Sequence, residues 1–247
     1  MQHSDAVVLF RRAGVLLCGL VLLHAPTRAA ILIHEYALRG SLSDNLGENS
    51  LTALGGQITD LGYVFAANQG LGFSSRLLTP TNYSIELSFR VDNAAGASKI
   101  VDFHNLTSDP GLYQQNGTLA FRPVTTTDIS DFASGTDIHI VLTRDGATDL
   151  VTAYVNGEQR FSFVDDLSLA APPGLSNKLN FFVDDELNLS GGTANYIRVF
   201  NGALAANDVS LLFQGGPPVL VPEPSSFILM TVGIMSLGIA FRRRLRG

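Results

Sequence analysis

Carboxylates are the side chains of this sequence with the most chemical potential, because paired acids can hydrolyse glycosidic bonds. The two acids of a glycosidase lie about 5–9.5 Å apart, on either side of the bond that is cleaved. On one strand, acids two or four residues apart would share a face and meet this need. The glutamates in the middle of the chain do not have this spacing: they are Glu35, Glu48, Glu86, Glu158 and Glu186. The chain also has no tryptophan to stack on a sugar ring.

Other catalytic groups have no better support in the sequence. Cys18 is the only cysteine, and no serine stands in a Gly-x-Ser-x-Gly motif. His34, His104 and His139 do not have the His-x-x-x-His spacing of a zinc site. No phosphate-binding or dinucleotide-binding glycine motif occurs either. We therefore expect a protein that is not an enzyme.

Adjacent aspartates are the best candidates for metal ligands. Calcium prefers carboxylate and carbonyl oxygens that gather on loops. Asp184 and Asp185 follow an expected strand and are the predicted calcium ligands, and Asp44 and the pair Asp165-Asp166 are further candidates. The alternative is that these aspartates are turn residues that accept backbone N–H groups. The residues that contact a ligand stay unknown, although several side chains could face a sugar: Tyr63, Tyr113, Asn116, Arg122, Tyr154 and Tyr196.

The N-terminus has the pattern of a secretory signal peptide. Arg11 and Arg12 precede an apolar run from Ala13 to Leu23, and Thr27-Arg28-Ala29 ends in a small residue suited to cleavage. The pattern predicts a signal helix over residues 1–29, export by the general secretory machinery and cleavage by signal peptidase. An uncleaved anchor is the alternative.

The C-terminus has the pattern of a membrane anchor. A linker over residues 215–224 contains Pro222, Glu223 and Pro224, and an apolar run follows from Phe227 to Phe241. At about 1.5 Å per residue such a helix is short for a bilayer, but flanking residues can extend it. A basic cluster comes next and predicts a cytoplasmic end: Arg242, Arg243, Arg244 and Arg246. We expect a transmembrane helix and tail over residues 225–247, the alternative being a buried helix of the main domain.

This tail resembles the PEP-CTERM sorting signal of Gram-negative bacteria in the order of its three parts. The resemblance covers about the last 27 residues. It implies that an exosortase, a membrane cysteine enzyme, recognises Glu223 and processes the chain near the Pro-Glu-Pro motif. It also implies an inner-membrane precursor that is delivered to the cell surface or to an exopolysaccharide matrix.

The middle of the chain, residues 30–214, has a different composition from the two ends. Nine basic and twenty acidic side chains lie in it, so its net charge is about −11, against −6 for the whole chain. Nucleic-acid binders need a basic surface, so we expect no nucleic acid as partner. About 185 residues are enough for one sizeable core.

Alternation of apolar and polar residues dominates this middle part. Tyr83 to Val91 places apolar side chains on one face and polar side chains on the other, which predicts a half-buried antiparallel strand. Asn116-Gly117 and Asn156-Gly157 predict tight hairpins. Other expected strands are Ile31–Leu38, Gly62–Phe65, Lys99–Phe103, Leu112–Tyr113, Leu119–Phe121, Asp137–Arg144, Leu150–Val155, Arg160–Val164, Leu179–Val183 and Asn195–Phe200. One short helix is expected at Ala205–Phe213. This pattern predicts an all-β sandwich.

Several stretches in order resemble the laminin-G-like domains of the concanavalin A-like lectin/glucanase superfamily. They are Tyr36–Asp44, Tyr83–Phe89, Val151–Gly157 and Ile197–Val209. The resemblance implies an antiparallel jelly-roll sandwich, and calcium at its rim is common among relatives. We therefore predict an exported matrix or surface protein that binds carbohydrate or exopolysaccharide. The alternatives are a structural or adhesive matrix protein without specific glycan binding and a divergent glycan-active hydrolase.

Overall fold

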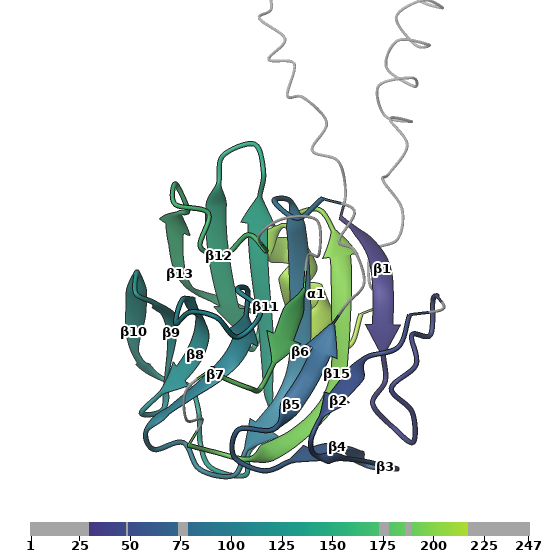
Figure 1. Cartoon of the computed structure of the whole chain (residues 1–247). Helices are drawn as coiled ribbons and strands as arrows, with labels where there is room; N and C mark the ends of the chain where they lie inside the picture. Colours follow the sequence, from purple (N-terminus) through teal and green to yellow (C-terminus); the bar gives the residue numbers. More distant parts are fainter. Residues whose placement is uncertain (1–29, 48, 74–78, 173–177, 186–188, 217–247) are drawn as a thin grey trace, which may run out of the picture.

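The computed structural model describes residues 30–47, 49–73, 79–172, 178–185 and 189–216. In these residues, fifteen strands form two antiparallel sheets that pack face to face, and there is one helix (Figure 1). The predicted signal peptide, the Pro-Glu-Pro motif, the apolar run and the basic tail lie outside the described residues. No helix in the described part is long and apolar enough to cross a membrane. The predicted all-β sandwich is confirmed.

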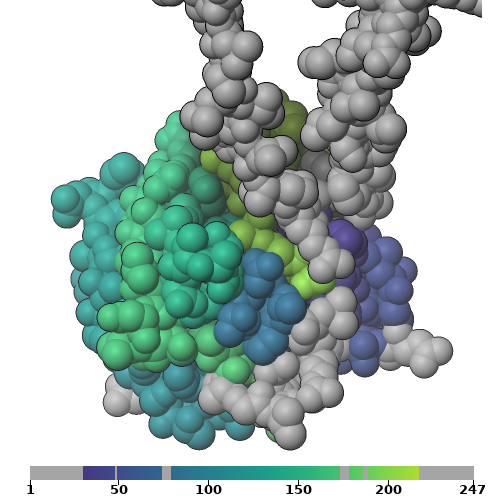
Figure 2. Space-filling view, turned by 90° about the horizontal axis from the view of Figure 1, so that it is seen from above, coloured from purple at the N-terminus to yellow at the C-terminus, as the bar shows by residue number. Residues whose placement is uncertain are grey.

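The first sheet, called the β6 sheet here, has eight strands in the described part of the chain. In spatial order it contains β13 (Glu158–Val164), β12 (Leu150–Val155), β11 (Ile138–Asp145), β6 (Tyr83–Val91), β15 (Gly192–Asn201), β4 (Gly62–Phe65) and β3 (Gln57–Thr59), and β1 (Ile31–Tyr36) pairs with the second half of β15. Figure 2 looks down on the sandwich and shows the region of β1 (purple) and that of β11 to β13 (green) at opposite sides.

The second sheet, called the β7 sheet, has seven strands in the described residues. In spatial order it contains β10 (Thr125–Ser130), β9 (Thr118–Arg122), β8 (Gly111–Gln115), β7 (Ala97–Asp102), β14 (Leu179–Phe181), β5 (Gly70–Phe73) and β2 (Thr52–Leu54). Neighbours such as β14 and β7 are far apart in sequence, so the sheet is held together by long-range pairing.

The core lies between the two sheets. The apolar face of β6 supplies Tyr83, Ile85, Leu87, Phe89 and Val91, as the alternation predicts. The opposing sheet supplies side chains that are equally buried: Val101, Leu112, Phe121 and Phe181. Burial of a side chain of this size stabilises the fold by about 1.5–3 kcal/mol.

A second hydrophobic cluster lies on the outer face of the β6 sheet, under helix α1 (Ala206–Phe213). Val209 and Leu212 of the helix are buried against Val141 and Phe200 of the sheet. The helix was predicted one residue longer, and its existence is confirmed. Both sheets, both clusters and the helix lie within residues 30–216, so we expect this segment to fold by itself.

The prediction that β6 is half-buried holds only for its second half, where Ser88 and Arg90 are partly exposed, because the polar face of its first half is covered. The hydroxyl of Ser84 donates to the carbonyl of Gly202 at 2.8 Å and accepts the N–H of Leu204 at 2.9 Å. Glu86, two residues on, is also fully buried. The segment that leads into α1, together with polar side chains of neighbouring strands, covers this first half of the face.

Candidate functional site

Lys99 stands at the centre of a polar network on the outer face of the β7 sheet. It lies on β7, directly opposite Tyr113 on β8. Leu112, next to Tyr113, belongs to the core, so the side chain of Tyr113 points to the outer face. Gly111 leaves room at this point, since a Cβ there would lie 2.6 Å from the carbonyl oxygen of Val101. The side chain of Lys99 is nevertheless fully buried.

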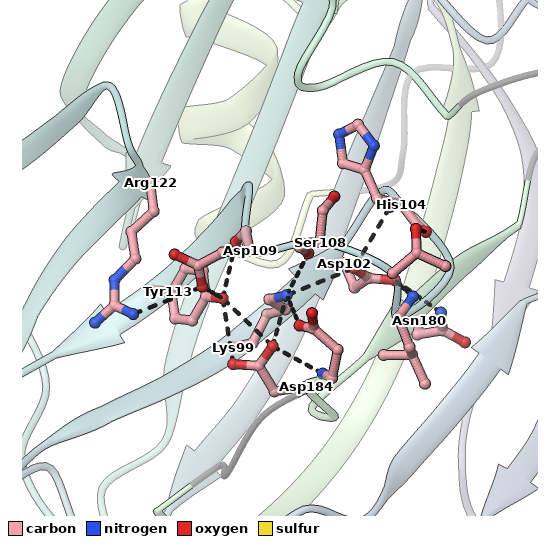
Figure 3. Close-up of polar contacts among 12 residues, drawn as sticks. Lys99, Asp102, His104, Ser108, Asp109, Tyr113, Arg122, Asn180 and Asp184 are labelled. Atoms are coloured by element: carbon pink, nitrogen blue, oxygen red, sulfur yellow. Dashed lines mark hydrogen bonds and ion pairs between the residues drawn. The ribbon is translucent and has the colours of Figure 1, made fainter.

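Three aspartates surround the ammonium group of Lys99 (Figure 3). Its Nζ lies 2.6 Å from Asp184 Oδ1, 3.1 Å from Asp185 Oδ1 and 3.6 Å from Asp102 Oδ1. The carbonyl oxygen of Ser108 accepts from it at 3.2 Å. We call Lys99, Asp102, Asp184 and Asp185 the Lys99 cluster. A buried charge needs such partners, because without them its burial costs several kcal/mol.

The charges of the cluster shift one another's pKa values. Burial alone would lower the pKa of Lys99, but the hydrogen bonds with Asp184 and Asp185 and the charges of Asp184 and Asp102 outweigh it and raise that pKa. Burial, and next the neighbouring Asp185, raise the pKa of Asp184 in spite of Lys99. The hydrogen bond with Asp184 lowers the pKa of Asp185. The single ammonium of Lys99 thus pairs with several acids. As the pH falls, Asp184 takes up a proton before Asp185 does.

The predicted calcium ligands Asp184 and Asp185 therefore lie together, but they both contact Lys99. The ammonium occupies the position between the two carboxylates that a calcium ion would need. In the described part of the chain, no group of three or more histidine, cysteine, aspartate or glutamate side chains is arranged to hold a metal ion. Calcium binding here stays a prediction, and it requires Lys99 to move away.

Two further aspartates that were considered as calcium ligands, Asp165 and Asp44, also have protein partners. Asp165 pairs with Arg144 at 2.9 Å and accepts the N–H of Leu169 at 2.7 Å. Asp44 contacts His34 Nδ1 at 2.6 Å. Burial would raise the pKa of Asp44, but this contact and backbone N–H groups lower it. Both residues follow the alternative interpretation, in which turn aspartates accept hydrogen bonds from their surroundings.

Tyr113 connects the Lys99 cluster to Arg122. The hydroxyl of Tyr113 donates to Asp109 Oδ1 at 2.7 Å and lies 3.2 Å from Asp184 Oδ2. Burial, and then the neighbouring acids, raise the pKa of Tyr113 far above its ordinary value. The guanidinium of Arg122 lies 4.3 Å from the centre of the Tyr113 ring, a cation–π contact (Figure 3). The Nε of Arg122 also donates to Gln115 Oε1 at 3.1 Å, so this arginine is held from two sides.

A surface hollow of about 320 Å³ lies beside Arg122, and we call it the Arg122 hollow. Its lining comes from β8, β9, β10 and the turn between the last two strands: Gln115, Ala120, Phe121, Arg122, Pro123, Val124, Thr125 and Thr126. The amide, the guanidinium and the two threonine hydroxyls can donate to or accept from a polar ligand. The hollow thus combines a fixed arginine with adaptable hydroxyl groups.

The tyrosines that could have faced a sugar are mostly unavailable. Tyr63 and Tyr113 are fully buried and Tyr154 is 6% exposed, so the interpretation of these three rings as sugar-binding surfaces is wrong. Tyr196 is half-buried and donates its hydroxyl to Glu86 at 3.0 Å. Asn116 occupies the predicted hairpin turn with a φ of +51°. Arg122 lines the Arg122 hollow, and Tyr196 lines a second surface hollow.

Sequence reasoning missed Lys99 and Glu86 as buried charges. Glu86 Oε1 accepts from Tyr196 and contacts His139 Nε2 at 2.9 Å, while its Oε2 lies 3.5 Å from Arg198 Nη1. We call these four residues the Glu86 cluster. Glu86 stands on the polar face of an alternating strand, and this pattern does not reveal which distant residues will cover it.

Comparison with known proteins identifies the C-terminal motif. A model of the PEP-CTERM protein-sorting motif matches residues 220–244. The chain therefore carries this motif, which implies export and processing by an exosortase. No match to the chain was found among curated protein sequences.

Solved structures of similar fold include binding domains of a toxin and a domain of an arabinanase. The binding domain of botulinum neurotoxin serotype D has a TM-score of 0.57 and 14% identity, over 75% of this chain and 52% of that one. The ligand-binding domain of this serotype in complex with N-acetylneuraminic acid scores 0.58 at 16% identity, over 74% and 50%. Domain 4 of AbnA, an extracellular GH43 arabinanase from Geobacillus stearothermophilus, in complex with arabinotriose, scores 0.55 at 17% identity, over 76% and 100%.

The chain spans about half the length of the toxin chains that it matches. At these identities the likeness shows the fold alone, an antiparallel sandwich of two sheets.

Proposed function

We propose that this chain is a non-enzymatic, exported protein whose sandwich binds carbohydrate at the cell surface or in the exopolysaccharide matrix. The Arg122 hollow is the proposed binding place. The observation that carries this proposal is a fixed arginine beside a solvent-facing hollow, on the outer face of a sheet in a lectin-like sandwich. Ligand sites are typically preformed hollows with a few well-placed polar groups.

The surroundings of Arg122 explain how such a site would be preformed. Tyr113 holds the guanidinium from one side, and the Lys99 cluster holds the hydroxyl of Tyr113 through Asp184. A guanidinium that is already fixed loses little conformational freedom when it donates to a sugar hydroxyl. The carbonyl of Gln115 and the hydroxyls of Thr125 and Thr126 add partners for neighbouring hydroxyls. The Lys99 cluster is then a support for the site and not part of its surface.

The sorting motif supports the place of action. In this proposal signal peptidase removes residues 1–29 after transport by the secretory machinery, and the C-terminal helix holds the precursor in the inner membrane of a Gram-negative cell. The exosortase then processes the chain near Glu223, which it recognises as a substrate residue. The two similar structures that contain a sugar support carbohydrate as the class of ligand.

Electrophoresis of residues 30–216 through gels with and without the source bacterium's exopolysaccharide tests carbohydrate binding. We expect the domain to migrate more slowly in the polysaccharide gel. Arg122→Ala should restore most of the mobility, whereas the matched control Arg90→Ala on the other sheet should not. Equal mobility of the unmodified domain in both gels would favour the structural or adhesive role. Release of reducing sugar during incubation would favour the hydrolase.

Replacement of Pro222, Glu223 and Pro224 by alanine tests the sorting route in the full chain. We expect the variant to accumulate in the inner-membrane fraction, while the unmodified chain reaches the surface fraction. Unchanged surface delivery of the variant would refute recognition of this motif.

A further inference from the structure

A second hollow, of about 200 Å³, lies on the outer face of the β6 sheet, and we call it the Arg39 hollow. Ile197 and Val199 of β15 belong to the core, so Arg198 between them points to the outer face. The lining comes from β15 and from β1 with the loop that follows it: Glu35, Ala37, Arg39, Asn45, Asn195, Tyr196 and Arg198. Because the two sheets pack through their inner faces, the Arg39 hollow and the Arg122 hollow lie on opposite sides of the sandwich.

The floor of the Arg39 hollow is held rigidly. The Nε of Arg198 donates to Glu35 Oε1 at 2.8 Å, and its Nη1 lies 3.5 Å from the fully buried Glu86. Its guanidinium also lies 4.8 Å from the centre of the Tyr196 ring. Burial would lower the pKa of Arg198, but Glu86 and Glu35 outweigh it and raise that pKa. The hollow therefore exists before any ligand arrives.

The charges around the hollow leave one cation without a partner. Arg198 faces two carboxylates, so its own charge is already matched. Arg39 is exposed, and in the described part of the chain it makes no ion pair. An unpaired arginine in a hollow is unusual in a domain whose net charge is about −11. Asn45 and Asn195 lie in the same lining, and their amide nitrogens already donate within the protein, that of Asn45 to Glu35 Oε2 at 3.4 Å and that of Asn195 to Asp137 Oδ1 at 3.2 Å. Their side-chain carbonyl oxygens can accept from a ligand.

We infer that the Arg39 hollow binds a carboxylated sugar, such as one uronic acid unit of a polysaccharide. Arg39 pairs with the sugar carboxylate, for which a guanidinium has the matching geometry. The side-chain carbonyl oxygens of Asn45 and Asn195 accept from hydroxyl groups of the same ring. The volume is below the usual range of about 300–1,000 Å³ for drug-sized ligands, which suits a single sugar unit.

Two glycan sites on opposite faces would let one domain bridge two polysaccharide chains. This bridging rests on the proposed function of the Arg122 hollow, whereas binding of a carboxylated sugar at Arg39 does not. A protein of this kind would cross-link a matrix instead of only attaching to it.

Binding of residues 30–216 to polygalacturonate and to uncharged dextran tests the Arg39 hollow. We expect Arg39→Ala to weaken binding to polygalacturonate about tenfold, as loss of one charged hydrogen bond does, and to leave dextran unaffected. Arg90→Ala, on the same face, is the matched control and should change neither. Arg39 is exposed and unpaired, so its variant should keep the melting temperature of the unmodified domain. Unchanged binding to polygalacturonate, or an equal loss for both polymers, would overturn the inference.

Aggregation of polygalacturonate-coated beads separates this inference from the proposed function, with exopolysaccharide-coated beads as the second partner. The unmodified domain should bridge the two kinds of bead, and Arg39→Ala and Arg122→Ala should each prevent bridging. If Arg122→Ala changes neither bridging nor gel mobility, the proposed function fails while the Arg39 site stands. If Arg39→Ala still bridges, the bridging role is refuted.

Discussion

Lys99 and Glu86 are both fully buried charges on outer faces of the sandwich, yet their surroundings have opposite sign. Lys99 is a cation among three carboxylates, two of which come from the loop after β14. Glu86 is an anion that contacts the nitrogens and hydroxyl of His139, Tyr196 and Arg198, all of them on neighbouring strands. One cluster is closed by a loop and the other by paired strands.

The charges near the two proposed binding places also differ. On the β7 sheet, acids outnumber the ammonium, so the Lys99 cluster keeps a net negative charge beneath Tyr113 and Arg122. On the β6 sheet, Arg198 lies between two glutamates, and Arg39 adds a free positive charge beside them. Our two proposals differ accordingly: hydroxyl groups of a carbohydrate meet the Arg122 hollow, and a carboxylated sugar meets Arg39.

Replacement of Lys99 by methionine should lower the free energy of unfolding more than any other change considered in this comparison. Lys99→Met leaves three acids without their cation, and breaking a buried pair in this way costs about 3–5 kcal/mol. Urea unfolding at neutral pH measures the change in the free energy of unfolding. Lys178→Met, at an exposed lysine, is the control and should cost less than about 0.5 kcal/mol. Similar losses of the free energy of unfolding for Lys99→Met and Lys178→Met would mean that the ion pairs of Lys99 with the aspartates add little to stability.

Glu86→Gln should cost less than Lys99→Met. Glutamine has the same shape and its carbonyl still accepts from Tyr196 and His139, so only the charge opposite Arg198 is lost. Loss of one charged hydrogen bond corresponds to about 1.5–3 kcal/mol. Glu158→Gln, on an exposed side chain, serves as the control in the same urea experiment. A larger loss than that of Lys99→Met would reverse our view of which cluster depends more on charge.

Calcium should have a smaller effect on stability, and this effect should come from the β7 sheet, where Asp184 and Asp185 lie. If the ion displaces Lys99 from Asp184 and Asp185, millimolar calcium raises the melting temperature of residues 30–216, by about 2–4 °C per kcal/mol of binding energy. The double variant Asp184→Asn, Asp185→Asn should lose this increase. Scanning calorimetry in calcium and in chelator measures both proteins. Equal curves for the unmodified domain in both buffers would end the proposal that this pair binds calcium.

The fold was more predictable from the sequence than the site. Strands β4, β6 and β12 begin and end as predicted, because alternation and turn residues are local signals. Strands β2, β3, β5 and β10 were missed. The first three have three or four residues, and β10 is rich in threonine, so their pairing partners define them more than their own pattern does.

The clusters could not be predicted, because their members are far apart along the chain. Glu86 meets His139 over 53 residues, and Lys99 meets Asp185 over 86. Alternation predicts which way Glu86 points, but it does not tell whether water or a protein group lies there. The same limit explains the aspartates: Asp184 and Asp185 were identified as a pair of interest, while the lysine between them was not.

The pH dependence of the Lys99 cluster should show opposite signs for its two neighbouring acids. The pKa of Asp185 is lowered from 3.8, so its stabilisation is fully present above pH 3.8 and is lost as the pH falls through the lower value of the folded state. The pKa of Asp184 is raised from 3.8, so its contribution is present below pH 3.8 and is lost as the pH rises through its folded value. Carboxyl carbon shifts in an NMR titration should therefore move at lower pH for Asp185 than for Asp184. Asp185 is partly exposed, so the stability that Asp185→Asn loses at neutral pH should be at most about 1 kcal/mol, and the loss should vanish in acid. If both carboxyls titrate together near pH 3.8, Asp184 and Asp185 interact equally with Lys99. The loop after β14 would then not give the Lys99 cluster a charge pattern different from that of the Glu86 cluster.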